Sequence, residues 1–397
     1  MATYRVAIIG TGRPRQQEGA TGFGMSHYHA KGYLASGRCE IVALADIRPE
    51  NAEAFRVDHS IPQAQVFTDY RQMLAEVRPD VVSICTWPHL HAEMAIAAAE
   101  AGVRAVHCEK PMAPTWGEAR RMHQVCVERG VQLTFNHQRR FEAPYVTARR
   151  LLREGAIGRL LQLQAACPNL YDWGTHWFDM FFYYNDETPA AWVLGQLDSR
   201  TERSVFGVPL EDQGISYVGF QNGVRGLLIT GDSIPGPEGR PRNALGAAQR
   251  MIGTEGILEV GALGPGTRVR LINAGGAGFR DVPLDDAPNS TEGAIAAGIA
   301  DLLSCLESGA EPQLSSFKAL RATELIFATY ESSRRRARID LPLQIEDSPF
   351  LTMLEQGLVG PKAHKAHEAH KAHEAHKAHE AHKAHKAHKA HEAHKAH

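Results

Sequence analysis

Short apolar runs alternate with helical patterns along the first third of the chain. The runs are rich in β-branched residues and apolar throughout, which is typical of strands in a parallel sheet that is covered on both faces. Between them, residues 91–101 and 115–129 follow helical periodicity, and Thr115 and Glu118 have the spacing of a capping box. This alternation predicts a doubly wound α/β domain. Its strands are predicted at residues 5–9, 40–45, 81–85, 105–108 and 132–135.

The pattern changes after about residue 136. Two short runs flank Gln221-Asn222-Gly223, a turn sequence that is typical of an antiparallel hairpin. We therefore predict a second domain of the α+β class with a mostly antiparallel sheet. Glycine and proline concentrate between residues 231 and 266, which predicts long loops there. Helices are predicted at residues 144–154, 175–184, 291–307 and 315–335, and strands at residues 160–166, 215–220 and 224–230.

The C-terminal end repeats Lys/Glu-Ala-His twelve times, from residue 362 to residue 397. It contains no residue that can fill a core, which predicts a solvated, disordered or partly frayed helical tail. Histidine at every third position can also chelate Ni²⁺, Zn²⁺ or Cu²⁺, but that affinity follows from composition alone. We therefore divide the chain into a first domain (1–135), a second domain (136–350) and a His-rich tail (361–397).

The 397 residues are 43% hydrophobic and 22% charged, as in ordinary globular proteins. The chain has a formal net charge of −2, and because the tail carries eight Lys against four Glu, the remainder carries −6. This balance argues against nucleic-acid and membrane partners. The six cysteines form no CxxC pair, and no long apolar segment occurs. We therefore expect a cytoplasmic protein without a metal site.

The first predicted strand runs into Gly10-Thr11-Gly12, which resembles the start of a dinucleotide-binding turn. In such a turn, missing side chains let the backbone approach a pyrophosphate at a helix N-terminus. The usual third glycine is displaced, and we interpret the intervening residues as an insertion that makes Gly24 the third glycine. The alternative is a glycine-rich turn that binds no phosphate.

Asp46 ends the second predicted strand, 22 residues after Gly24. A Rossmann carboxylate at about this spacing accepts hydrogen bonds from the adenine ribose hydroxyls. The same carboxylate would repel a 2′-phosphate, which favours NAD over NADP. Arg13, Arg15 and Arg48 keep NADP open, because a guanidinium could accommodate the phosphate. A helix-capping role for Asp46 is the alternative.

Two further segments carry candidate catalytic groups. Lys110, flanked by Glu109 and Pro111, follows a predicted strand at the edge where doubly wound sheets bind ligands, and it could stabilise an alkoxide there. If a helix starts near Asp172, Asp172 and His176 share one face, so the carboxylate can orient the imidazole. The alternatives are a solvated lysine, a capping aspartate and a core histidine.

These motifs, in this order, resemble the Gfo/Idh/MocA family, named after glucose–fructose oxidoreductase, inositol dehydrogenase and the rhizopine-catabolism protein. The resemblance covers roughly residues 4–350 and includes Thr86-x-Pro88-x-x-His91, the segment from Asn136 to Phe141 and Gly253-Thr254-Glu255-Gly256. It implies a Rossmann domain followed by an open-faced sheet domain that builds the substrate pocket and often oligomerises. It also implies catalytic roles for Lys110, Asp172 and His176, and cofactor contacts from Gly10, Gly12, Asp46, Thr86, Pro88, His91 and Glu109. The insertion after Gly12 is a departure from the family pattern.

The resemblance implies a hydride transfer between nicotinamide and a secondary alcohol or ketone of a sugar, sugar derivative or cyclitol. We expect a homo-oligomer, either a dimer or a tetramer. A rival enzyme is a glycosidase that uses bound NAD for transient oxidation and elimination, and a third option is a nucleotide sensor without catalysis. The substrate contacts that we expect come from Lys110, Asn136, Arg140, Tyr171, Trp173 and His176, whereas the alternative for the aromatic residues is the domain core.

Overall fold

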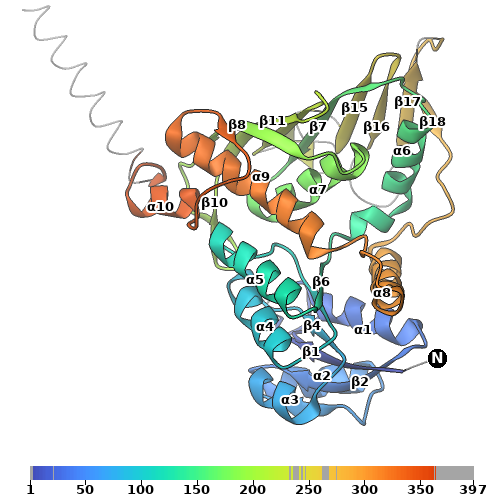
Figure 1. Cartoon of the computed structure of the whole chain (residues 1–397), viewed down its shortest axis with the longest axis vertical. Helices are drawn as coiled ribbons and strands as arrows, with labels where there is room; N and C mark the ends of the chain where they lie inside the picture. Colours follow the sequence, from blue (N-terminus) through green and yellow to red (C-terminus); the bar gives the residue numbers. More distant parts are fainter. Residues whose placement is uncertain are drawn as a thin grey trace, which may run out of the picture.

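The computed structural model describes residues 3–20, 22–231, 234–235, 241–242, 245, 247–261, 268–273, 275–361 and 363. The predicted tail lies outside this part of the chain from residue 364 onward, as do parts of the glycine-rich stretch. Figure 1 shows two units, one built around a parallel sheet and the other around a larger mixed sheet. No helix among the described residues is long and apolar enough to cross a membrane.

The N-terminal unit has a six-stranded parallel sheet with the order β3-β2-β1-β4-β5-β6. This order is that of a Rossmann domain, so the doubly wound prediction is confirmed. The edge strand β3 was not predicted, because three residues give too short a pattern. The strands are β1 (Tyr4–Ile9), β2 (Cys39–Ala45), β3 (Gln65–Phe67), β4 (Val81–Ile84), β5 (Ala105–Cys108) and β6 (Gln132–Phe135). The helices are α1 (Met25–Ala35), α2 (Pro49–Asp58), α3 (Tyr70–Val77), α4 (Pro88–Glu100) and α5 (Trp116–Glu128).

Successive side chains of β1 point into two different apolar cores. Ile9 packs in the core that includes α3, α4 and α5, whereas Ile8 faces α1 and α2. A helix from much later in the chain, α8 (Thr291–Ser308), also covers this second face and lies beside α1 in Figure 1. Gly32 permits this approach, because a Cβ there would lie 2.6 Å from Ile299 Cδ1. The C-terminal half of the chain therefore completes the core of the N-terminal unit.

The second unit has a nine-stranded sheet with the order β18-β17-β16-β15-β7-β12-β11-β8-β19. Only the β7–β12 pair is parallel among the ladders of this sheet that the described residues form, so the mostly antiparallel sheet is confirmed. The strands are β7 (Leu160–Cys167), β8 (Ala190–Asp198), β11 (Gln213–Phe220), β12 (Arg225–Thr230), β15 (Gln249–Gly253), β16 (Gly256–Val260), β17 (Val269–Asn273), β18 (Arg280–Val282) and β19 (Ile339–Asp340).

One face of this sheet is covered and the other is open. Helices α6 (Ala143–Arg153), α7 (Thr175–Tyr184) and α9 (Ser316–Arg335) pack on the side that looks toward the N-terminal unit (Figure 1). Val218 on β11 is fully buried, whereas Leu194 and Ile215 point away from the helices and are 48% and 46% exposed. The open face of the sheet therefore carries exposed apolar side chains on β8 and β11.

Shorter elements complete the described chain. Two small ladders form, β9 (Arg203–Val205) with β10 (Val208–Leu210) and β13 (Ile234–Pro235) with β14 (Pro241–Arg242). A 3₁₀ turn, η1 (Gln138–Phe141), precedes α6, a π-helical turn, η2 (Leu170–Gly174), precedes α7, and α10 (Pro349–Glu355) lies near the end. The predicted capping of α5 is present, with Thr115 Oγ1 accepting from the Glu118 N–H.

The prediction of long loops across residues 231–266 is wrong in part, because β15 and β16 form a hairpin there. Met251 and Leu258 on these strands are fully buried. The glycines at the hairpin turn serve close approach: a Cβ on Gly253 would lie 2.1 Å from the carbonyl oxygen of Ile157. The glycines of this hairpin allow its strands to pack closely against neighbouring backbone. The loop prediction was wrong here because it rested on glycine and proline content alone.

Candidate active site

A cavity of about 460 Å³ lies at the carboxyl edge of the parallel sheet, where doubly wound sheets bind ligands. Phe23, Trp87 and Phe206 form part of its wall. Phe206 comes from the turn between β9 and β10, so the second unit contributes to the cavity. Nine of the predicted site residues line the cavity together: Gly10, Gly12, Gly24, Asp46, Arg48, Thr86, Pro88, Glu109 and Lys110.

The glycine-rich turn opens its backbone to this cavity. Gly10 has a φ of +81°, and a Cβ there would lie 2.8 Å from Thr86 Cγ2, so a side chain does not fit. Gly24 also has a positive φ and directly precedes α1, whose N-terminus has no side-chain cap. The first residues of α1, Met25 and Ser26, line the cavity. This uncapped helix N-terminus suits a phosphate group.

Asp46 follows β2 and contacts the glycine-rich turn. One carboxylate oxygen accepts from Thr11 Oγ1 at 2.9 Å and from Gly12 N at 3.0 Å, and the other accepts from Arg48 N at 2.9 Å. A carboxylate has about four lone-pair positions and three are occupied, so Asp46 retains capacity for one ribose hydroxyl. The Arg48 side chain is exposed at the same wall.

His91 is not among the residues that line the cavity. Its side chain is fully buried, with Nδ1 2.9 Å from the Pro111 oxygen and Nε2 3.1 Å from the Thr86 oxygen. Burial lowers the pKa of His91, which keeps the imidazole neutral, so it donates to one of these two carbonyls at a time. His91 therefore holds the loop after β4 against the loop after β5, and it does not lie at the cavity wall.

A buried ion pair supports the loop that carries Lys110. Glu109 Oε1 lies 2.9 Å from His29 Nε2 and accepts from Asn136 Nδ2 at 2.7 Å. Burial alone would lower the pKa of His29, but the charges and hydrogen bonds of Cys85 and Glu109 outweigh it and raise that pKa to about 10. Burial likewise opposes ionisation of Glu109, yet His29, Asn136 and Lys110 lower its pKa to about 2. The pair is therefore charged at neutral pH.

Lys110 joins the cofactor edge to the second unit. Its Nζ donates to Asp172 Oδ1 at 2.6 Å and to the Asp172 main-chain oxygen at 3.2 Å. Asp172 lies on the π-helical turn η2, where Asn169 Oδ1 accepts from its N–H at 2.7 Å. The sequence predicted an α-helical pairing of Asp172 with His176, but the wider π-helical turn breaks that spacing and the carboxylate binds Lys110.

His176 lies in the first turn of α7 and is buried, with 4% of its surface exposed. Its Nδ1 has no hydrogen-bond partner among the described residues. Burial lowers the pKa of His176 well below its ordinary value, and the charges of Arg139, Lys110 and His137 lower it further. The imidazole is therefore neutral at neutral pH and able to accept a proton.

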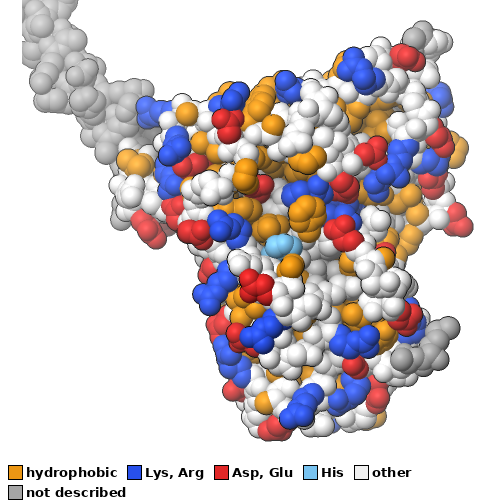
Figure 2. All heavy atoms as spheres, viewed as in Figure 1, with side chains coloured by type: hydrophobic (Ala, Val, Ile, Leu, Met, Phe, Trp, Pro, Cys, Tyr) orange, Lys and Arg blue, Asp and Glu red, His pale blue; other side chains and the backbone are white. Residues whose placement is uncertain are grey.

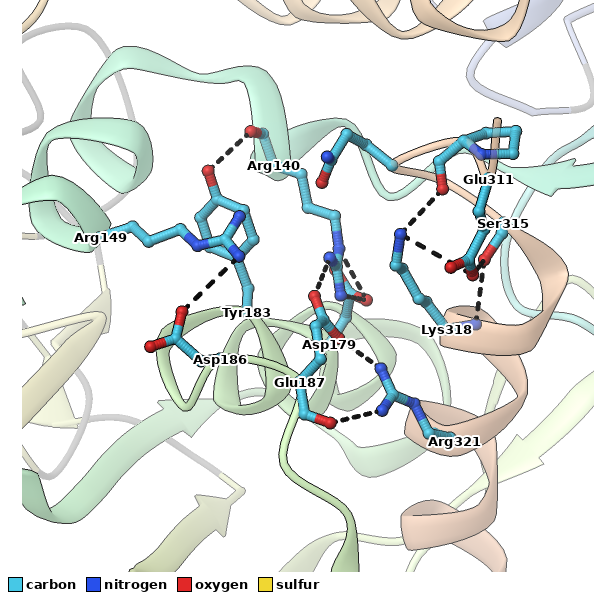
Figure 3. Close-up of polar contacts among 12 residues, drawn as sticks. Arg140, Arg149, Asp179, Tyr183, Asp186, Glu187, Glu311, Ser315, Lys318 and Arg321 are labelled. Carbon is cyan, nitrogen blue, oxygen red and sulfur yellow. Dashed lines mark hydrogen bonds and ion pairs between the residues drawn. The ribbon is translucent and has the colours of Figure 1, made fainter. Parts of the chain in front are cut away.

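Arg140 is committed to ion pairs. Its Nε lies 2.8 Å from Asp179 Oδ2, and its Nη1 lies 2.6 Å from Glu187 Oε1. The other oxygen of Glu187, Oε2, pairs with Arg321. Figure 3 shows the Arg140 guanidinium enclosed by these two carboxylates. Because its side chain is fully buried in this network, the geometry does not favour the predicted substrate contact.

The remaining predicted substrate residues divide between the site and the core. Asn136 binds Glu109 through Nδ2, and its Oδ1 has no partner among the described residues. Tyr171 is 3% exposed and packs with β9 and β10, which favours the core alternative. Trp173 is half-buried, whereas Trp177 is fully buried and donates to the Ala166 oxygen.

Sequence reasoning missed three residues that the structure brings to this region: His29, Arg139 and Phe206. His29 follows the helical periodicity of α1 as any core residue would, so its pattern carried no separate signal. Phe206 reaches the cavity through long-range packing, which local sequence does not encode. Arg139 lies next to Arg140 in η1, and the sequence did not distinguish the two.

These features fit a nicotinamide dinucleotide: a side-chain-free turn, an uncapped helix N-terminus, a carboxylate after β2 and a lysine after β5. They define the class of dinucleotide-dependent oxidoreductases with a Rossmann domain. Residues 4–137 match the family model described as an oxidoreductase family with an NAD-binding Rossmann fold. The chain is an oxidoreductase whose N-terminal domain binds NAD, and this domain is similar to the Rossmann domains of the Gfo/Idh/MocA family.

Known relatives agree with this assignment. The chain is 27% identical to D-apiose dehydrogenase of Paraburkholderia graminis over 383 residues, which cover 90% of this chain and 94% of that protein. It is 31% identical to inositol 2-dehydrogenase of Paracoccus denitrificans over 170 residues, 42% of this chain and 46% of that protein. A levoglucosan dehydrogenase solved with NADH and levoglucosan has the same fold, with a TM-score of 0.70 and 21% identity over 86% of this chain and 100% of that chain.

Proposed function

We propose that the chain transfers a hydride between NAD and a secondary alcohol or ketone of a sugar, sugar derivative or cyclitol. The observation that carries this proposal is the contact of Lys110 with Asp172, because it connects the dinucleotide cavity to the turn that precedes His176. Relatives that are dehydrogenases of D-apiose and inositol support the substrate class.

The roles of three side chains follow from their surroundings. NAD, when bound, supplies the hydride acceptor at nicotinamide C4. Lys110 would hold the substrate oxygen and stabilise its negative charge, and Asp172 orients the Lys110 Nζ. His176 would take the hydroxyl proton at Nε2, because its Nδ1 is buried. The lowered pKa of His176 keeps this base unprotonated in the resting site.

We also propose that the site prefers NAD to NADP. Asp46 lines the cavity after β2, and a 2′-phosphate bound beside this carboxylate would be repelled. The exposed Arg48 is the group that could soften this preference.

The partners that we propose are small molecules and further copies of the chain, in the cytoplasm. On the face drawn in Figure 2, basic and acidic side chains are interspersed, which does not favour a nucleic-acid surface there. The outer face of the nine-stranded sheet, with exposed Leu194 and Ile215, is the surface that we propose for self-association. Light scattering should show a dimer or tetramer that Leu194→Glu weakens, whereas Val127→Glu on α5, also exposed, should have no effect. A monomeric wild-type protein would contradict this.

The test is a panel of aldoses, alditols, inositols and sugar nucleotides, each with NAD and with NADP, followed by absorbance at 340 nm. We expect net NADH formation with at least one member, and none with Lys110→Ala. Release of a sugar from a glycoside without NADH accumulation would instead support the NAD-dependent glycosidase. Binding of NADH without turnover of any substrate class would support a nucleotide sensor.

A further inference from the structure

Glu211 differs from the other buried acidic residues in having no cationic partner. It lies between β10 and β11 and is fully buried. Six acidic residues are buried in the described part of the chain: Glu109, Asp172, Asp179, Glu211, Glu259 and Glu331. Five of them pair with a histidine, a lysine or an arginine, whereas Glu211 makes no ion pair with a described residue. Burying a carboxylate is costly unless hydrogen bonds compensate it, so the donors around Glu211 indicate what it holds in place.

These donors come from three other elements. Glu211 Oε1 accepts from the N–H of Leu170, the first residue of η2, and from Thr230 Oγ1 on β12 at 3.2 Å. Its Oε2 accepts from the Tyr330 hydroxyl on α9 at 3.1 Å. Burial raises the pKa of Glu211, and the hydrogen bonds oppose that rise because they favour the ionised form. Glu211 therefore joins the start of η2 to the sheet and to α9.

The contact with Leu170 lies on the turn that carries Asp172. A π-helical turn is an uncommon conformation, so η2 depends on acceptors at its start. Glu211 holds the Leu170 N–H, and Asn169 Oδ1 accepts from the Asp172 N–H at 2.7 Å. The Asp172 carboxylate in turn accepts from Lys110 Nζ at 2.6 Å. A continuous series of contacts therefore runs from Glu211 through η2 to Lys110.

We propose that Glu211 is a positioning residue for the reaction, because its hold on the first N–H of η2 keeps the Asp172 carboxylate at Lys110 Nζ. This inference rests on the proposed function, to which it adds a residue that does not line the dinucleotide cavity. Without this acceptor, η2 would relax and Lys110 would lose its fixed partner. A small displacement of such a group lowers kcat by about 10²-fold. Binding of NADH at the glycine-rich turn should not change.

Reductive methylation of lysines, quantified by mass spectrometry, measures how firmly Lys110 Nζ is held without requiring a substrate. Lys31 is the reference in each sample, because its side chain is 51% exposed, against 18% for Lys110. The ratio of Lys110 to Lys31 labelling should be about ten- to a hundredfold higher in Asp172→Asn than in wild type, the effect of losing a charge-assisted hydrogen bond. In Glu211→Met the ratio should rise toward that of Asp172→Asn. The double variant should not exceed Asp172→Asn, because Glu211 acts through Asp172.

Two further variants separate positioning from a general loss of stability. Glu211→Gln keeps an oxygen that can accept from the Leu170 N–H, so its ratio should lie closer to wild type than that of Glu211→Met. Glu259→Met removes another buried carboxylate, which pairs with Arg250 and Arg270. It should lower Tm and leave the labelling ratio at the wild-type value. With a substrate from the panel, Glu211→Met should lower kcat about 10²-fold and leave the Kd of NADH unchanged.

The outcomes distinguish this inference from the proposed function. If Glu211→Met does not fold, Glu211→Asp takes its place, because it keeps the charge but is one methylene shorter and withdraws from the Leu170 N–H. A wild-type labelling ratio in the folded variant, or an equal rise in Glu259→Met, would overturn the inference. NADH formation that the folded variant leaves unchanged would also overturn it, while the proposed function stands. A rise confined to the Glu211 variants, without NADH formation by the wild-type protein from any substrate, would support the hold on Asp172 and contradict the proposed function.

Discussion

Replacing His29 with alanine should destabilise the protein strongly, because the side chain is buried far from the surface. The side chain touches none of the proposed substrate groups. His29 Nε2 is paired with Glu109 at 2.9 Å, and the side chains of the two residues are 0% and 9% exposed. The variant leaves Glu109 buried with Asn136 as its remaining side-chain donor. Because Glu109 precedes Lys110, the same change should loosen the position of Lys110, for which we propose a role in stabilising the substrate oxygen.

The size of the effect follows from burial. Removing one partner of a buried ion pair costs about 3–5 kcal/mol, because the other charge loses its compensation. A second residue of α1 provides the matched control: Lys31 pairs with Glu292 of α8. Their side chains are 51% and 49% exposed, and exposed pairs contribute about 0–1 kcal/mol. His29→Ala should therefore lower the free energy of unfolding several times more than Lys31→Ala does.

The pH dependence provides a second check on the same pair. The pKa of His29 is raised from 6.5 to about 10, so its stabilisation is complete below pH 6.5 and is lost as pH rises toward 10. The pKa of Glu109 is lowered from 4.5 to about 2, so its stabilisation is complete above pH 4.5 and is lost as pH falls toward 2. The difference in stability between wild type and His29→Ala should be largest between pH 4.5 and 6.5.

Urea unfolding, followed by circular dichroism at several pH values, measures these differences. A His29→Ala variant that loses no more stability than Lys31→Ala would refute the buried pair. A difference from wild type that grows between pH 7 and 10 would refute the charge state assigned to His29.

Three further predictions concern the cofactor, the base and the tail. Asp46→Ala should weaken NADH binding about ten- to a hundredfold in fluorescence titration and NADPH binding much less; an unchanged preference would remove Asp46 from the ribose site. His176→Ala should lower kcat about 10²–10⁴-fold while NADH binding survives. The pKa of His176 lies well below 6.5, so protonation of this imidazole should not slow oxidation by the wild-type enzyme between pH 8 and 6.5. A near-normal kcat in His176→Ala would instead make Lys110 the base. Truncation after Gly360 should leave Tm and kcat unchanged and abolish retention on a Ni²⁺ resin; a large drop in Tm would mean that the tail packs on the body.

The sequence predicted the parts of the fold that depend on local pattern. The strands of the parallel sheet are short apolar runs, and α5 begins where Thr115 caps it, as expected. The hairpin of β15 and β16 was missed because its glycines resemble those of a loop, although Gly253 is needed for close packing against Ile157. The packing of α8 on α1 was not predictable, because it depends on a contact between residues more than 250 positions apart.

In the candidate site, too, the features that depend on local sequence pattern were predictable and those that depend on packing were not. The glycine turn and Lys110 follow directly from strand ends, because a parallel sheet brings its carboxyl edges together. The partner of Asp172 depends on a π-helical turn that Asn169 caps, and the pattern of residues does not reveal such a turn. Which of Arg139 and Arg140 pairs with a carboxylate depends on where α7 places Asp179, and this is a property of the fold.

Hydride transfer itself can be followed with a label. A substrate identified in the panel is prepared with deuterium on its carbinol carbon and incubated with NAD and stoichiometric enzyme, and the nucleotide is then analysed by mass spectrometry. The account predicts one deuterium per reduced nicotinamide, and no labelled product with Lys110→Ala. Conversion of the substrate with the deuterium absent from the nicotinamide, or with the label returned to the product carbon and no reduced nucleotide, would contradict it.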